Sequence, residues 1–152
     1  MKTLDYKEIL KLAIRNEIEA YEFYHSAAVK ARTENLESTF RELAGEEMNH
    51  RRTLEGFLLN ESLTLNFKNS RDDFKVSESV ELPPLTTDMS FADGVALAMK
   101  KEEEAMDMYK KFAAASEDPG QKSTFLQLAA MEQGHKLKLE DLYTNAAFVE
   151  AW

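Results

Sequence analysis

The sequence contains no cysteine, which excludes disulfides, thiolate metal sites and a cysteine nucleophile. Glycine (5) and proline (3) are scarce, as in chains that are mostly helical. No run of about 18 apolar residues occurs, so no membrane-spanning helix and no membrane partner are expected. Basic residues are also too few to balance the acidic ones. The formal net charge of −9 argues against a nucleic-acid partner, because phosphate binding needs a basic face.

With 152 residues, the chain is long enough to bury one core, and we expect a single domain over residues 1–152. Its first residues, MKTLDYKEILK, lack an apolar stretch of signal-peptide length. The expectation is therefore a soluble cytoplasmic protein.

Two Glu-x-x-His motifs are the most informative feature of the sequence. Glu47 precedes His50, and Glu132 precedes His135. Residues three apart share one face of a helix, so each carboxylate and imidazole can converge on one point. The two motifs are separated by one offset, since 132 − 47 and 135 − 50 both equal 85. A single motif is a weak metal signal, whereas two at one offset are a strong one.

The offset of 85 extends through both halves of the chain and marks an ungapped internal repeat of two helical hairpins. It also selects one glutamate from the run at positions 102–104, because Glu17 is paired with Glu102. The other matched pairs are Ala13 with Ala98, Ala20 with Ala105, Tyr24 with Tyr109, Phe40 with Phe125, Leu43 with Leu128, Ala44 with Ala129 and Leu54 with Leu139.

Apolar periodicity and capping residues predict four helices, over residues 5–31, 35–60, 90–116 and 118–145. Asp5, Ser90 and Asp118 are the expected N-terminal caps, and Pro119 follows the last of them as a first helical residue. About thirty residues, 61–89, separate the second helix from the third. This length exceeds a hairpin turn, and it can span the ~39 Å length of a ~26-residue helix.

This segment therefore predicts a crossover along the bundle, after which the third helix runs parallel to the second. The expected fold class is all-α, a four-helix bundle built from two repeated hairpins with one long crossover. That connectivity is ferritin-like.

The apolar stripes of the four helices are interrupted near the middle of the bundle by six residues: Glu17, Glu47, His50, Glu102, Glu132 and His135. Buried carboxylates that face each other are costly unless a cation compensates them, and Arg51 alone cannot offset four. One glutamate from each of two helices and a Glu-x-x-His from each of the other two is the ligand set of dinuclear iron and manganese bundles. Imidazole ligands favour iron, manganese or zinc over magnesium or calcium.

We therefore predict two metal ions, with iron preferred and manganese or zinc as alternatives. Glu47 and Glu132 would bridge the two ions. Glu17 and Glu102 would be terminal ligands, and His50 and His135 would each bind one ion.

The pattern Ala-x3-Glu-x2-Ala-x3-Tyr, found at Ala13–Tyr24 and at Ala98–Tyr109, resembles the rubrerythrin-type ferritin-like domain. The stretch LAGEEMNH at positions 43–50 does so too. The resemblance covers all four helices. It implies two irons, reduction of hydrogen peroxide, a homodimer, and hydrogen bonds from Tyr24 and Tyr109 to the metal-binding carboxylates.

Two departures from this family bear on function. Rubrerythrins carry a four-cysteine rubredoxin domain, whereas this sequence has no cysteine, so an external redox protein would have to donate electrons. Rubrerythrins also carry a further glutamate where this chain has Ala105. The remaining set is similar to the bacterioferritin ferroxidase centre and to manganese catalase, although the lack of a fifth helix argues against a bacterioferritin-like cage.

Three classes of function therefore stay open. The first is a redox enzyme acting on peroxide or dioxygen. The second is a ferroxidase that handles ferrous iron, and the third is a non-catalytic helical bundle.

Overall fold

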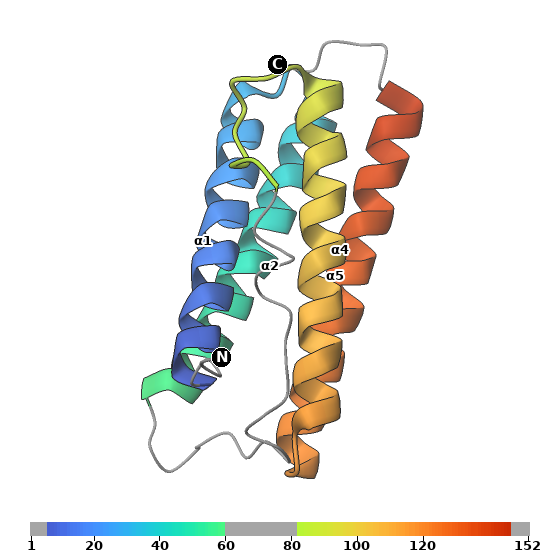
Figure 1. Ribbon diagram of the computed structural model, residues 1–152. Coiled ribbons are helices and arrows are strands. Elements are labelled where there is room, and N and C mark those ends of the chain that lie inside the picture. The colour runs from blue at the N-terminus through green and yellow to red at the C-terminus, as the bar shows by residue number, and fades with distance from the viewer. Residues whose placement is uncertain (1–5, 60–81, 147–152) are drawn as a thin grey trace.

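The structure is a computed structural model that describes residues 6–59 and 82–146. Four long helices lie side by side in it (Figure 1): α1 (Tyr6–Lys30), α2 (Glu34–Leu59), α4 (Phe91–Ala115) and α5 (Pro119–Ala146). Each helix end differs by one residue from the expected bounds. The predicted cap Asp5 and most of the predicted crossover lie outside the described residues.

Side-chain caps fix where three of the helices begin. Thr33 Oγ1 accepts a hydrogen bond from the amide of Leu36 at 3.2 Å, at the start of α2. Ser90 Oγ accepts one from the amide of Asp93 at 3.2 Å, before α4. At α5, Asp118 Oδ2 accepts one from the amide of Gln121 at 2.9 Å. These bonds satisfy amides that have no partner within the helix.

The helices form two antiparallel hairpins, α1 with α2 and α4 with α5, which pack together as one bundle (Figure 1). Helices α2 and α4 both start at the same end of the bundle, so they run parallel, as the crossover prediction requires (Figure 1). The predicted fold class, an all-α four-helix bundle, is confirmed. Within the described ranges, no helix has the length and apolar character needed to cross a bilayer.

The core consists of two apolar clusters with a polar layer between them. Along α1, Leu10 and Ile14 belong to one cluster, Tyr24 and Ala28 belong to the other, and Glu17 lies between. Along α2, Leu43 and Leu54 flank the motif at positions 47–50 in the same way. Burying these apolar side chains stabilises the bundle on both sides of the polar layer, which holds its charged groups in a fixed, water-poor position.

Candidate metal centre

All six residues that the sequence predicts as ligands meet in the polar layer, and none is more than 3% exposed. One comes from α1 and one from α4, and α2 and α5 supply two each. They are Glu17, Glu47, His50, Glu102, Glu132 and His135.

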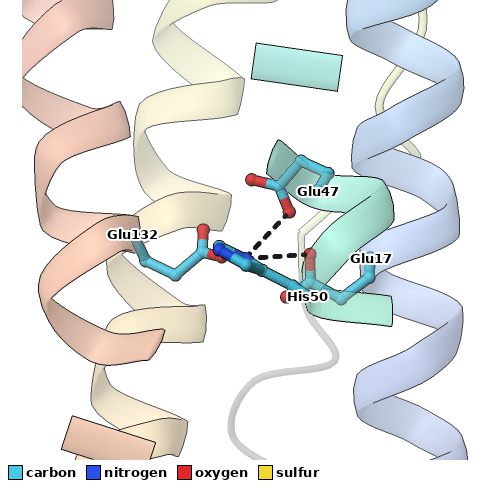
Figure 2. Close-up of side chains that lie close together, drawn as sticks. All are labelled: Glu17, Glu47, His50 and Glu132. Atoms are coloured by element: carbon cyan, nitrogen blue, oxygen red, sulfur yellow. Dashed lines mark hydrogen bonds and ion pairs between the residues drawn. The ribbon is translucent and has the colours of Figure 1, made fainter. Parts of the chain in front are cut away.

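The six side chains divide into two groups of four, and within each group one ligand atom per residue lies within 4.8 Å of the others. The first group contains Glu17 and His50, and Figure 2 shows their side chains pointing toward Glu47 and Glu132. The second contains Glu102 and His135 together with the same two glutamates. Glu47 and Glu132 are therefore shared, which is the geometry that two bridging carboxylates require.

Each histidine reaches across to the other hairpin. His50 Nδ1 lies 2.6 Å from Glu132 Oε1, and His135 Nδ1 lies 2.6 Å from Glu47 Oε1. The two imidazole rings stack with their centroids 5.6 Å apart and their planes 10° from parallel. The two contacts are related by the repeat, so the centre has approximate two-fold symmetry.

The two repeat-related tyrosines also cross between the hairpins. The hydroxyl of Tyr24 donates a hydrogen bond to Glu102 Oε1 at 2.5 Å, and that of Tyr109 donates one to Glu17 Oε1. Burial raises the pKa of both phenols well above 10, and nearby glutamates add to this effect. Both tyrosines are therefore neutral donors at any physiological pH, and each fixes one carboxylate oxygen while leaving the other free.

Those other oxygens, Oε2 of Glu17 and of Glu102, are buried and receive no hydrogen bond from the described part of the chain. A buried carboxylate oxygen without a partner is costly, on the order of 1–3 kcal/mol or more. A cation bound by each group of four ligand atoms would satisfy the oxygen in that group. Arg51 does not serve this purpose, because its Nε lies 3.3 Å from Glu55 on its own helix.

Without metal, the two shared glutamates have pKa values that are shifted in opposite directions. Burial raises the pKa of Glu47 well above its usual value, and the charges of Glu132 and Glu17 raise it further. Burial would also raise the pKa of Glu132, but hydrogen bonds from His135 and His50 outweigh that effect and lower it. The shared carboxylates thus differ: Glu47 tends to hold a proton and Glu132 a charge.

The histidines hold protons in the same metal-free state. Burial lowers the pKa of His50, but hydrogen bonds to Glu132 and Glu17 outweigh burial and raise it to about 9. Burial also lowers the pKa of His135, but hydrogen bonds to Glu132 and Glu46 and the charges of these residues outweigh burial and raise it. A raised pKa favours the protonated imidazole, so a metal that binds Nδ1 competes with a proton there and should release it.

The donor set fits two divalent transition metals. Carboxylates bridge hard cations, each imidazole offers one nitrogen, and each group of four contains one glutamate with an unsatisfied oxygen. The sequence did not predict the partner of His135 Nε2, which is the carboxylate of Glu46. His25, whose repeat position in the second half is Lys110, is exposed and stacks on Tyr21.

A cavity of about 230 Å³ leads from the surface between α1 and α4 to the buried glutamates. Ala20 and Ala105, a pair related by the repeat, line it, as do Glu17 and Glu102. Lys101 and Glu19 form an ion pair across its wall, with Nζ and Oε1 2.8 Å apart. The volume admits only small molecules, since drug-sized ligands need about 300–1,000 Å³.

The fold and the buried carboxylate–histidine cluster define a ferritin-like bundle with a candidate dinuclear metal centre. The rubrerythrin family model matches residues 8–143, and the chain belongs to the rubrerythrin family. No curated protein matches the sequence.

Two solved structures share the fold. One is a proposed ferritin-like diiron-carboxylate protein from Thermotoga maritima, with 19% identity and a TM-score of 0.72 over 96% of this chain and 99% of that one. The other is a hypothetical protein from Pyrococcus furiosus, with 28% identity and a TM-score of 0.73 over 98% of this chain and 94% of that one.

The tyrosine hydrogen bonds make a prediction about metal affinity. Tyr24→Phe and Tyr109→Phe should each weaken metal binding about 10- to 100-fold, the usual loss when a partner of a ligand is removed. Tyr143→Phe, at a side chain that is 39% exposed, should leave binding unchanged. Calorimetric titration of the metal-free variants with Co²⁺ measures both effects. Unchanged affinity in both buried variants would show that the tyrosines only fill the core.

Proposed function

We propose that this chain binds two iron ions through the six clustered residues and reduces hydrogen peroxide with electrons from an external redox protein. The observation that carries the proposal is the sharing of Glu47 and Glu132 between two complete groups of four ligand atoms. Family membership supports the same reading, as does the Thermotoga maritima neighbour, which is described as a proposed diiron-carboxylate protein. Manganese and zinc are the alternative metals.

In this proposal the four glutamates and two histidines of the cluster hold the metal pair. When bound, a pair of ferrous ions supplies the two electrons that, with two protons, convert hydrogen peroxide into two water molecules. Tyr24 and Tyr109 keep Glu102 and Glu17 oriented by donating to one oxygen of each. The two apolar clusters lie on either side of the polar layer, and the cavity offers small molecules a route to the terminal glutamates.

Repeated turnover distinguishes this proposal from its alternatives. Protein reconstituted anaerobically with ferrous iron is mixed with hydrogen peroxide and an excess of a reduced rubredoxin as donor. Consumption of many equivalents of peroxide per chain supports the proposed oxidoreductase. Oxidation of the bound iron once, without turnover, supports a ferroxidase. Protein that binds iron but leaves peroxide unreacted would contradict the proposed peroxide reduction.

The position of the cavity predicts the route by which peroxide reaches the metal centre. Ala105→Leu should narrow the path between α1 and α4 and slow peroxide-dependent iron oxidation several-fold, without changing iron content. Ala114→Leu is the matched control, because Ala114 lies on the same helix but is exposed and does not line the cavity. Stopped-flow absorbance measures the rates. Equal rates in the two variants would mean that peroxide enters elsewhere.

A further inference from the structure

The internal repeat is broken at the residues that contact the outer nitrogens of the two histidines. Glu46 and Met131 occupy the same repeat position, since 131 − 46 equals 85. The carboxylate of Glu46, on α2, contacts Nε2 of His135 on α5. In the reciprocal place, the sulfur of Met131, on α5, lies 3.4 Å from Nε2 of His50 on α2.

Both histidines present Nδ1 to the glutamate cluster, so Nε2 is the atom that each partner can influence. Nε2–H of His135 donates to a carboxylate, which holds the ring in one tautomer and one orientation with Nδ1 available for a metal. Nε2–H of His50 has a thioether acceptor, and thioether sulfur is a weak acceptor without charge. A carboxylate partner raises the basicity of a ligating imidazole, which a thioether does to a much smaller degree.

We propose that Glu46 is a positioning residue that makes the two metal positions unequal. The position formed by Glu47, Glu102, Glu132 and His135 fills first and binds more tightly, by about 10- to 100-fold. The position that contains His50 fills second. This inference rests on the proposed binding of two metals and adds the order in which they bind.

The second metal must also bind against the charge of the first, which lowers its affinity whichever position fills first. Repulsion alone would give two unequal steps without selecting a position, because the six ligands obey the repeat. One position is filled first only if the two positions differ. Glu46 and Met131 provide such a difference, because they occupy the same repeat position next to the two histidines. The test must therefore identify which histidine is occupied, as well as how tightly.

Co²⁺ is the probe, because it does not turn over and its unpaired electrons shift the Nε2–H proton of a ligating histidine in the NMR spectrum. At one equivalent of Co²⁺, the wild-type protein should show one shifted exchangeable proton, which keeps its chemical shift in His50→Gln. In His135→Gln that signal should be replaced by one at a different chemical shift, because Co²⁺ then occupies the position that contains His50. Calorimetry should show a tight step followed by a weaker one.

The decisive test is a variant in which Glu46 and Met131 are exchanged. In the double variant Glu46→Met with Met131→Glu, the first equivalent should move to His50. The shifted proton should therefore keep its chemical shift in His135→Gln and be replaced by a signal at a different chemical shift in His50→Gln. Glu46→Met alone should weaken the tight step about 10- to 100-fold. Should that variant fold poorly, Glu46→Gln, which keeps an acceptor but removes the charge, should give a smaller loss.

Glu42→Met is the matched control, because Glu42 also joins α2 to α5, through an ion pair with Lys138 at 3.1 Å, yet touches neither histidine. Both Co²⁺ steps should be unchanged in it. The inference fails if Glu46→Met behaves like Glu42→Met, or if the exchange leaves His135 occupied first. If the wild type binds no Co²⁺, the proposed metal binding itself is contradicted. If two Co²⁺ ions bind but the His50 position fills first, only the inference about the order of binding is contradicted.

Discussion

Glu47→Gln should abolish binding of the metal pair and at the same time stabilise the metal-free protein. The two effects have one cause, since the carboxylate is placed for two cations and is unfavourable without them. Its oxygens belong to both groups of four ligand atoms, and burial together with Glu132 and Glu17 raises its pKa. Glutamine keeps the size of the side chain but cannot bridge two cations as an anion.

The expected loss is large because bridging carboxylates screen the metals from each other. Two unit charges 4 Å apart interact by ~4 kcal/mol at an effective dielectric of ~20, so two divalent ions would repel by roughly four times as much. Affinity for the pair should therefore fall by more than the ~100-fold upper loss for an outer partner. His50→Gln, which removes a ligand from one position only, should weaken one binding step more than the other.

Metal titration and thermal melting of the metal-free protein measure the two effects of Glu47→Gln. Glu22→Gln is the control, because Glu22 is exposed on α1 and should change neither quantity. If Glu47→Gln binds two irons as tightly as the wild type and retains peroxide turnover, Glu47 is not a bridge, and the repeat-based choice of Glu102 loses its support as well.

Without metal, the folded protein should lose stability as the pH rises from about 6.5 to 9. The pKa of His50 is raised from 6.5 to about 9, so the folded state keeps a proton that the unfolded chain releases. The resulting stability is fully present below the unfolded value of 6.5 and is lost as the pH rises through the folded value. His135 and Glu47 act in the same direction, because their pKa values are also raised.

The contribution of Glu132 to the stability of the folded protein changes with pH in the opposite direction, and it does so at lower pH. Its pKa is lowered, so its contribution is present above about 4.5 and is lost only as the pH falls below that value. The difference of about 2.5 pKa units at His50 corresponds to on the order of 3 kcal/mol. For a chain of this size, that is a fall in melting temperature of roughly 6–12 °C.

Melting temperatures of metal-free and iron-loaded protein across this range test the prediction. In the loaded protein, metal in place of the Nδ1 protons should remove the dependence between pH 6.5 and 9 and raise the melting temperature throughout. A metal-free protein whose melting temperature is constant from pH 6.5 to 9 would show that the histidines are not paired with the glutamates as described.

The repeat made much of this architecture predictable. One offset selected Glu102 over its neighbours, and the structure buries Glu102 while Glu103 is exposed. The helix ends followed from local caps such as Ser90 and Asp118, whose hydrogen bonds involve residues only three positions away. Such features depend on short-range geometry, which the sequence encodes directly.

Contacts between the hairpins were not predictable in the same way. The family resemblance implied that Tyr24 donates to a metal-binding carboxylate, but not that this carboxylate is Glu102 on the other hairpin. The contact of Glu46 with His135 was not predicted at all. Both pairs depend on how the hairpins are rotated against each other. Glu46 lies beside the Glu-x-x-His motif and is not one of the six residues that interrupt the apolar stripes. Its departure from the repeat, opposite Met131, was the one signal that could have identified it.

The most direct test of the dinuclear centre is the iron content of the protein after anaerobic reconstitution with ferrous iron and removal of loosely bound metal. Six converging ligands with two shared carboxylates predict two iron ions per chain. Elemental analysis that finds no retained iron, or a single ion per chain at saturation, would contradict the account.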